Sequence, residues 1–433
     1  MVAKVSNRFE KSTRFLTRAE ESIPIGSQTF SKSRTQYPVG ISPLFATRAT
    51  GPYLWDLDGN KYIDLVSNLA SVTLGYRDRR VDSAVRKQMK LGNGFSLPST
   101  LEAFIAEKII SIVPSAEMVR FGKNGTDATS AAIRLARAYT GRDYVAVCGY
   151  HGWQDWFIGS TSRNKGVPRS TSSLTLTFNY NKIETLEKLI KEYPKKIAAV
   201  IMEPMTSEYP TNNFLNKVKK LCEKNGTILI FDETITGFRF AKGGAQELFQ
   251  VTPHLSTFGK GIANGYPLSV VCGNREIMKE MENIFFSGTF GGELLSLAAA
   301  NVVLELHEKD EVSPKLIEYG EDLSNSLEKL IEQLGIGDFF QIKGHPTWKF
   351  LEWKEVSGFT VPEIKTLFMQ EMFHRGVILL GTHNVSLAHG KKIRGEIIEI
   401  YWKVLSIVEN SIRVGSLRER LQTKPLEPIF KVR

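Results

Sequence analysis

The pattern of apolar and polar positions divides the chain into stretches with different predicted elements. Up to about residue 75 the signals are those of short strands, after an N-terminal segment, MVAKVSNRFEKSTRFLTRAE, that predicts an amphipathic helix. The alternating segment GPYLWDLDGNKYIDLV contains Asp58-Gly59, a pair typical of a β-hairpin turn. The segments RDRRVDSAVRKQM and STLEAFIAEKIISIV then show the apolar spacing of helices.

From about Met118 the pattern becomes an alternation of strands and helices. Gly141 stops a helix predicted at Asp127–Thr140. The predicted strands are the apolar runs EMVRF, YVAVCGY, IAAVIMEP, TILIFDET, HLSTFGK and LSVVCGN. Continuous apolar strands of this kind are typical of a mostly parallel sheet that is covered on both faces.

From about Pro314 the pattern changes again. A long helix is predicted at Lys315–Leu334, followed by mixed segments and a helix around GEIIEIYWKVLSIVENSI. We therefore expect an α/β protein with a large domain at residues 76–313. The N-terminal segment 1–75 and the C-terminal segment 314–433 are expected to form a smaller α+β domain.

Composition and charge narrow the class of protein. The 433 residues, 42% hydrophobic and 24% charged, are typical of a soluble globular protein with two or three structural units. No apolar run reaches the roughly 18 residues needed to cross a bilayer, so we expect no membrane partner and a cytoplasmic location. The three cysteines are far apart and indicate neither a metal site nor a disulfide framework.

The net charge of +10 raises the question of a nucleic-acid partner. Lysine and glutamate alternate along helical segments such as KIETLEKLIKEYPKK, which is typical of a solvated helix face rather than a basic patch. We therefore expect no nucleic-acid partner, and the basic excess is only a weak hint of an anionic substrate.

Polar residues follow the predicted strands at the end where α/β sheets bind their ligands. A single charge at a strand end is usually just solvated, but several together are harder to explain in a purely structural sheet. These residues are Tyr150 and His151, Glu203, Asp232 and Glu233, and Lys260.

The segment KNGTDA places Asn124, Gly125 and Thr126 at the start of the predicted helix Asp127–Thr140. The N–H groups and the positive dipole end of a helix N-terminus suit a phosphate. The alternative is a plain helix cap in which Thr126 is the capping residue.

Together these features describe the needs of one cofactor, pyridoxal phosphate. Lys260 can form the Schiff base and move a proton, and Asp232 can keep the ring nitrogen protonated. Tyr150 can lie on the ring, and the Asn124–Thr126 loop can hold the phosphate.

The chain resembles the class III aminotransferases, most closely those similar to glutamate-1-semialdehyde aminomutase. The resemblance covers nearly the whole chain and rests on WDLDGNKYIDLV, VPSAEMVRFGKNGTDATSAAIRLARAYTGR, GYHGWQDW, IMEP, FDETITGFR, TFGKGIANGYPLS, SGTFGGE and SLAH. It implies the fold type I of pyridoxal-phosphate transferases and a homodimer with shared active sites.

The same resemblance implies roles for individual residues. Lys260 corresponds to the Schiff-base lysine, Asp232 to the partner of the ring nitrogen and Tyr150 to the stacking ring. Thr289 of the GTFGG segment corresponds to a residue that reaches the phosphate in the neighbouring subunit. His151 and Glu203 are expected beside the cofactor, Glu203 as a polar support.

The chain departs from the aminomutase pattern around the substrate. Lys32 stands roughly where the aminomutases have a carboxylate-binding arginine, and lysine lacks the two-pronged fork of arginine. Leu69 replaces a pocket-lining tryptophan, and Glu208 stands where a Gly-Asn pair is usual near the ring hydroxyl. Lys32 and Glu208 are therefore candidate substrate residues.

These departures favour transfer between two molecules over exchange within one. We expect an amino-acid donor, L-glutamate, and a small ketone or aldehyde acceptor. By analogy with relatives that share a KNGTDA-like loop and an EPIFKVR-like tail, the expected acceptor is a phosphorylated ketone or a keto sugar for surface-polysaccharide biosynthesis. The alternatives are an aminomutase and a non-catalytic protein that binds pyridoxal phosphate.

Overall fold

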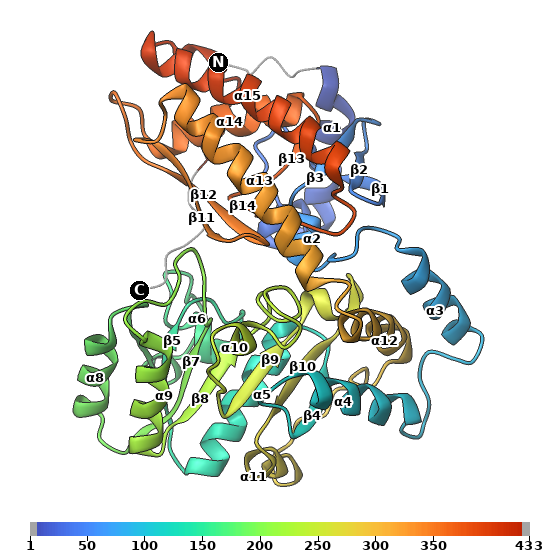
Figure 1. The fold of residues 1–433 in the computed structure, drawn as a ribbon, viewed down its shortest axis with the longest axis vertical. Helices are drawn as coiled ribbons and strands as arrows, with labels where there is room; N and C mark the ends of the chain where they lie inside the picture. The colour runs from blue at the N-terminus through green and yellow to red at the C-terminus, as the bar shows by residue number, and fades with distance from the viewer. Residues whose placement is uncertain (1–6, 427–433) are drawn as a thin grey trace. The chain divides into compact units, whose positions relative to one another are not determined.

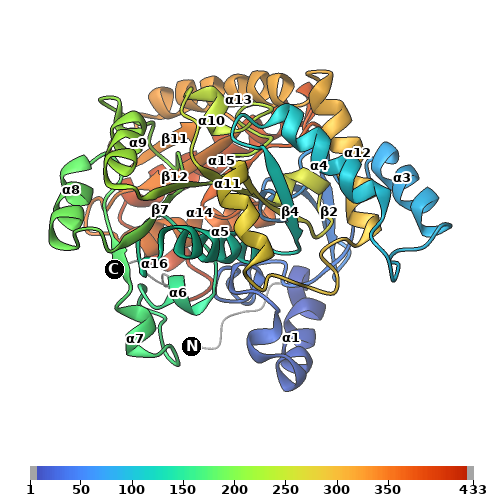
Figure 2. The same cartoon turned by 90° about the horizontal axis from the view of Figure 1, so that it is seen from below.

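The structure, a computed structural model, describes residues 7–426. Within them the chain forms two compact units (Figures 1 and 2). One unit runs from Arg79 to Pro314, and the other combines the chain up to Asp78 with the chain from Lys315 onward. The EPIFKVR tail, residues 427–433, lies outside the described residues. Among the described residues no helix has the length and apolarity needed to cross a membrane.

A seven-stranded sheet is the centre of the Arg79–Pro314 unit. Its strands are β4 (Met118–Gly122), β5 (Tyr144–Cys148), β6 (Thr175–Thr177), β7 (Ile197–Met202), β8 (Ile228–Asp232), β9 (Leu255–Phe258) and β10 (Ser269–Gly273). Their spatial order is β4-β10-β9-β8-β7-β5-β6. The neighbours from β9 to β6 are parallel, whereas β10 is antiparallel to both β9 and β4. The prediction of a mostly parallel sheet is therefore confirmed, although the short edge strand β6 was not predicted.

Helices cover both faces of this sheet. They are α3 (Arg79–Met89), α4 (Thr100–Ile112), α5 (Gly125–Thr140), α6 (Asp155–Ile158), α7 (Arg169–Ser172), α8 (Ile183–Glu192), α9 (Phe214–Asn225), α10 (Ala245–Leu248), α11 (Arg275–Met278) and α12 (Leu294–Glu308), with 3-10 turns at Lys260–Ala263 and Lys279–Glu282. On β7, Ala199 and Ile201 pack in the same cluster as α5, while Val200 and Met202 pack in the cluster of α8 and α9. Both faces of the strand are thus buried, which explains its unbroken apolar run.

Helix α5 begins earlier than predicted, and the difference concerns the predicted phosphate loop. The helix starts at Gly125 rather than Asp127, and Asn124 is its N-cap. The Asp127 side chain accepts from the Asn124 N–H at 2.8 Å, as in a capping box. The alternative in which Thr126 caps the helix is therefore wrong, because Thr126 already lies in the first turn.

The second unit contains two smaller sheets. The first has the order β1-β2-β3-β13 and the second β11-β12-β14. The strands are β1 (Ala46–Thr50), β2 (Tyr53–Asp56), β3 (Lys61–Asp64), β11 (Phe340–His345), β12 (Trp348–Trp353), β13 (Val377–Ile378) and β14 (Thr382–Asn384). The predicted hairpin is confirmed, since β2 and β3 are antiparallel and Gly59 has a φ of 89° in the turn.

Helices and turns complete this unit. They are α1 (Glu10–Ser22), α2 (Ser67–Ala70), α13 (Ser313–Leu334), α14 (Val361–His374), α15 (Lys391–Arg413) and α16 (Leu417–Arg420), with 3-10 turns at Asn7–Phe9, Pro24–Gly26 and Phe30–Lys32. The two long helices predicted in the C-terminal segment correspond to α13 and α15.

The short element α2 is a left-handed turn. Its residues, from Ser67 to Ala70, have φ values of 47°, 50°, 59° and 66° although none is glycine. Such a run costs roughly 1–2 kcal/mol per residue, so other contacts must hold it in place. Asp64 accepts from the Ser67 N–H at 3.1 Å, and the Ser67 hydroxyl donates to the Asn384 carbonyl at 2.6 Å. Leu69, a residue singled out in the sequence analysis, belongs to this strained turn.

Candidate active site

The carboxyl ends of the parallel strands place the predicted residues next to one another. His151 follows β5, Glu203 follows β7, Asp232 ends β8 and Lys260 follows β9. The His151 Nδ1 lies 2.8 Å from Asp232 Oδ2. Lys260 interacts electrostatically with both Glu203 and Asp232, which completes one cluster of charged groups in a single unit.

Asp232 is the most heavily hydrogen-bonded member of the cluster. Its side chain is 4% exposed, and its oxygens accept from His151, from Thr234 and from the Thr257 hydroxyl. Burial acts to raise the pKa of Asp232, but the hydrogen bonds from His151 and Thr234 and the charge of His151 outweigh it, so that the pKa is lowered. Asp232 is therefore a stable anion despite its burial.

His151 connects this carboxylate to β5. Its Nε2 lies 3.1 Å from the Cys148 carbonyl, which can only accept, so Nε2 donates. The other nitrogen faces Asp232. The ring is therefore fixed from both sides.

Glu203 supports the loop that carries Tyr150. Its Oε2 accepts from the Tyr150 N–H at 3.0 Å. Gly149 has a φ of 103°, and a Cβ at this position would lie 2.5 Å from Glu203 Oε2, so only glycine allows this approach. Burial and the charge of Asp232 raise the pKa of Glu203.

Lys260 has an unusual backbone as well as a perturbed amine. Its φ is 46°, in the left-handed region, at the start of a 3-10 turn directly after β9. Burial lowers the pKa of Lys260 below the 10.5 of a free lysine, while the charges of Glu203 and Asp232 act in the opposite direction. The lowered pKa favours the neutral amine, which is the nucleophilic form.

The Asn124–Thr126 loop has the properties of a phosphate cradle. It opens the 16-residue helix α5, whose first N–H groups and dipole favour an anion. The Thr126 hydroxyl is buried and has no hydrogen-bond partner among the described residues. A buried hydroxyl without a partner is costly, and a bound phosphate oxygen would satisfy it. The residues present therefore fit the phosphate of the expected cofactor.

Tyr150 lies beside this cluster with its ring partly accessible. The ring is 49% exposed and meets Phe157 edge to face at 5.6 Å. A tyrosine held at its edge can offer its face to a flat ligand.

Glu233 does not belong to the cluster in the same way. It accepts from the backbone N–H groups of Ala245 and Gln246 at the start of α10 and has a structural role.

Two predicted residues lie outside this cluster, and a third belongs to the other unit. Glu208 is exposed on the loop after β7 and interacts with Tyr180. Thr289 is exposed and lines a cavity of about 440 Å³ whose lining also includes Lys123 and Asp127, on either side of the Asn124–Thr126 loop. Lys32 belongs to the other unit, where its Nζ donates to Asn68 Oδ1 at 2.6 Å.

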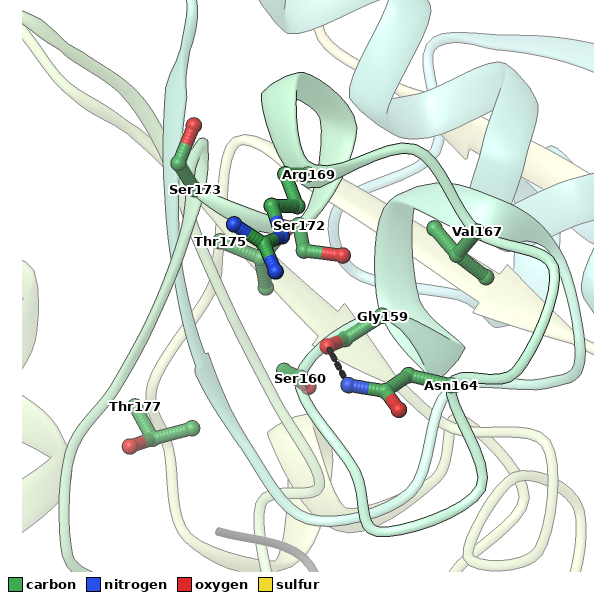
Figure 3. A pocket seen from close by; sticks show the side chains of 9 residues that line it. All are labelled: Gly159, Ser160, Asn164, Val167, Arg169, Ser172, Ser173, Thr175 and Thr177. Carbon is green, nitrogen blue, oxygen red and sulfur yellow. Dashed lines mark hydrogen bonds between the residues drawn. The ribbon is translucent and has the colours of Figure 1, made fainter.

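A further cavity, of about 540 Å³, contains none of the predicted residues (Figure 3). It is lined by hydroxyl groups and one cation, from Gly159, Ser160, Asn164, Val167, Arg169, Ser172, Ser173, Thr175 and Thr177. The hydroxyl hydrogens of Ser160 and Ser173 are already donated to backbone carbonyls.

Sequence reasoning missed two residues of the cluster, Thr234 and Thr257. The Thr234 signal is local, because an aspartate side chain commonly accepts from the N–H two residues on. The sequence alone does not indicate the role of Thr257, because this residue contacts Asp232 from the neighbouring strand β9.

Comparisons with known proteins show which sequences and structures this chain is similar to. The family model for class III aminotransferases matches residues 36–391. Glutamate-1-semialdehyde 2,1-aminomutase of Alkaliphilus metalliredigens is 34% identical over 432 residues, covering 93% of this chain and 98% of its own. The enzyme of the same name from Syntrophobacter fumaroxidans is 35% identical, covering 80% of this chain and 86% of its own.

Among solved structures, the PLP internal aldimine form of the FumI protein of Sphingopyxis sp. MTA144 has a TM-score of 0.87 and 28% identity, covering 94% of this chain and 98% of its own. These findings confirm the predicted fold class and pyridoxal phosphate as the cofactor.

The environment of Lys260 predicts a pH dependence of cofactor uptake by the apo-protein. Only the neutral amine reacts with an aldehyde, so the rate of uptake should rise with pH and level off below pH 10.5, because the pKa of Lys260 is lowered. The Glu203→Gln variant removes a charge that raises this pKa, so its midpoint should lie at lower pH. Growth of the visible absorption band after mixing with pyridoxal phosphate measures the rate.

Glu187→Gln, which removes an exposed carboxylate from α8, is the matched control and should leave the midpoint unchanged. Equal midpoints in the Glu203→Gln variant and the wild type would contradict the electrostatic contact between Glu203 and Lys260.

Proposed function

The chain belongs to the class III aminotransferases, and on that premise we propose that it transfers an amino group from an amino-acid donor, L-glutamate, to a small ketone or aldehyde. The observation that carries the proposal is the cluster at the strand ends. There a buried anionic aspartate and a lysine with a lowered pKa lie beside a helix N-terminus with an unsatisfied hydroxyl.

Most residues of the cluster have a proposed role in binding the cofactor, and Lys260 has a proposed role in proton transfer. Pyridoxal phosphate supplies an aldehyde that binds amines and a ring that withdraws electrons. The N–H groups at the start of α5 and the Thr126 hydroxyl would hold the phosphate, and Asp232 would hold the ring nitrogen and favour its protonated form. Tyr150 would lie against the ring, and the amine of Lys260 would move the proton at the Cα of the substrate.

Two residues of the other unit support transfer between two molecules. Lys32 is a single point charge that donates to Asn68, so it does not offer a carboxylate the bidentate grip of arginine. Leu69 gives the left-handed turn an aliphatic side chain where the aminomutases have a tryptophan. Both changes argue against a pocket shaped for glutamate semialdehyde.

The acceptor that we propose is a phosphorylated ketone or a keto sugar used for surface polysaccharide. This choice rests on the basic net charge of +10, on Lys32 as a cation for an anionic group, and on analogy with relatives that share the KNGTDA loop.

The second candidate function is an aminomutase that moves the amino group within one molecule. The observation that favours it is the name of the curated relatives, glutamate-1-semialdehyde 2,1-aminomutase, at 34–35% identity. The two functions differ in whether a second amino compound is consumed.

A further part of the proposal is a homodimer in which Thr289 of one subunit reaches the cofactor phosphate of the other. Large apolar side chains around this segment are exposed: Phe285 is 81% and Phe290 67% exposed. Leu91, Phe95, Leu97 and Trp153 of the same unit are also exposed. Exposed apolar groups in such number are typical of an interface.

The first prediction concerns the two residues that carry the chemistry. Lys260→Ala should lose the visible band of the bound cofactor and lower kcat by at least about 1,000-fold, because the nucleophile and the proton carrier are lost together. Asp232→Ala should retain part of the cofactor but have little turnover, because the ring is no longer held protonated. Transamination by Lys260→Ala at the wild-type rate would refute the mechanism.

The second prediction separates the two functions. With glutamate as donor, a matching ketone should be aminated with one 2-oxoglutarate released for each amine formed, and triose phosphates and nucleotide-linked keto sugars are the first acceptors to test. Isomerisation of glutamate 1-semialdehyde by the purified enzyme without any second amino compound would favour the aminomutase instead.

The third prediction tests the shared active site. Lys260→Ala and Thr289→Glu chains should each be inactive alone, the latter because a carboxylate faces the phosphate. After unfolding and refolding together, they should regain about a quarter of the wild-type activity, because about half of the dimers are mixed and each of these has one intact site. If each subunit supplies its own complete site, the mixture stays inactive.

A further inference from the structure

The two oxygens of the Asp232 carboxylate have unequal sets of donors. Oδ1 accepts from the Thr234 N–H at 3.1 Å, the Thr234 hydroxyl at 2.5 Å and the Thr257 hydroxyl at 3.1 Å. Oδ2 accepts only from His151 Nδ1, at 2.8 Å, among the contacts of the described residues. An ionised carboxylate has about four lone-pair positions, so Oδ1 is saturated and Oδ2 keeps one position.

The two hydroxyl groups reach Oδ1 from different strands. Thr257 lies on β9 and is fully buried, so its hydroxyl cannot turn to water. Thr234 follows β8 and is half-buried at the edge of the cluster. Together they fix the rotation of the carboxylate about its last bond, because any turn away from this orientation breaks both hydrogen bonds.

The methyl group of Thr234 has a second set of neighbours. A Cβ built on Gly125 would lie 3.0 Å from Thr234 Cγ2, and one built on Gly259 would lie 3.4 Å from the same atom. Gly125 belongs to the phosphate loop and Gly259 precedes Lys260. Thr234 therefore lies where the phosphate loop, the aspartate and the lysine segment meet.

We propose that Thr234 is a positioning residue, which together with Thr257 fills Asp232 Oδ1 so that Oδ2 alone is presented to the ring nitrogen of the cofactor. The Thr234 methyl group lies next to Gly125 of the phosphate loop. The inference rests on the proposed role of Asp232 and names residues that this role requires.

Two substitutions test the hydroxyl group and the methyl group of Thr234 separately. In Thr234→Val the shape stays and the hydroxyl is lost, so Oδ1 keeps only the Thr234 N–H and the Thr257 hydroxyl as donors and the carboxylate is held less firmly. In Thr234→Ser the hydroxyl stays and the methyl group is lost. Thr257→Val removes the other hydroxyl from Oδ1, and Thr140→Val, at the far end of α5, is the control for the substitution itself.

The experiment measures binding of pyridoxal phosphate to the purified apo-proteins by absorbance titration, with the spectrum of the bound cofactor as a second readout. Thr234→Val should weaken binding roughly tenfold, since one hydrogen bond to a charged group is lost, and should shift the spectrum toward the form with an unprotonated ring nitrogen. Thr257→Val should act in the same direction. Thr234→Ser should restore most of the affinity and the wild-type spectrum.

Thermal unfolding of each apo-protein shows whether a variant is folded before it is titrated. If Thr234→Val is unfolded, the inference is tested by comparing Thr257→Val with the control Thr140→Val. For both variants the affinity and the spectrum of the bound cofactor are measured in the same way. Wild-type affinity and spectrum in folded Thr234→Val or Thr257→Val would overturn the inference.

Failure of the proposed function has a different signature. A wild-type protein that binds pyridoxal phosphate but transfers no amino group from any donor would refute the function, while the order of affinities among the variants would still test the positioning of Asp232.

Discussion

The Asp232 carboxylate, buried at the end of β8, is the interaction on which the rest of the site depends. A buried carboxylate is stable only if its oxygens accept hydrogen bonds. Here four donors from three segments of the chain supply those hydrogen bonds. Those donors come from the ends of β8 and β9 and from the loop after β5, so the charge holds neighbouring strand ends in register. The same charge acts to raise the pKa of Lys260 and of Glu203, and so it sets the electrostatics of the whole cluster.

The parallel sheet explains why the cluster can form at all. Strands β5, β7, β8 and β9 run in the same direction, so their carboxyl ends meet at one edge, and side chains far apart in the chain become neighbours. The apolar strands are buried on both faces, which leaves their ends as the places where polar groups reach a ligand. Helix α5 begins at the same edge, because its N-terminus follows β4 directly, and its first N–H groups favour an anion.

Two residues with proposed roles are among those with a strained backbone or an unsatisfied polar group. Lys260 has a left-handed backbone, and the Thr126 hydroxyl is buried without a partner among the described residues. In the other unit, the turn from Ser67 to Ala70 is left-handed over four residues. Such conformations persist only where the surroundings hold them, which is typical of sites that bind a ligand in a fixed geometry.

The sequence by itself determined the fold class, the strand ends and the identity of the main chemical groups, because apolar periodicity and local motifs depend on neighbours along the chain. Its apolar runs indicated that Lys260 and Asp232 lie at strand ends. It could not show that Thr257 reaches Asp232, because that contact crosses between strands. The start of α5 was also decided by a side-chain contact, the capping of Asn124 by Asp127, which the periodic pattern does not contain. Only the tertiary structure decided which oxygen of the aspartate has fewer donors, because the answer depends on donors from three separate segments meeting at one carboxylate.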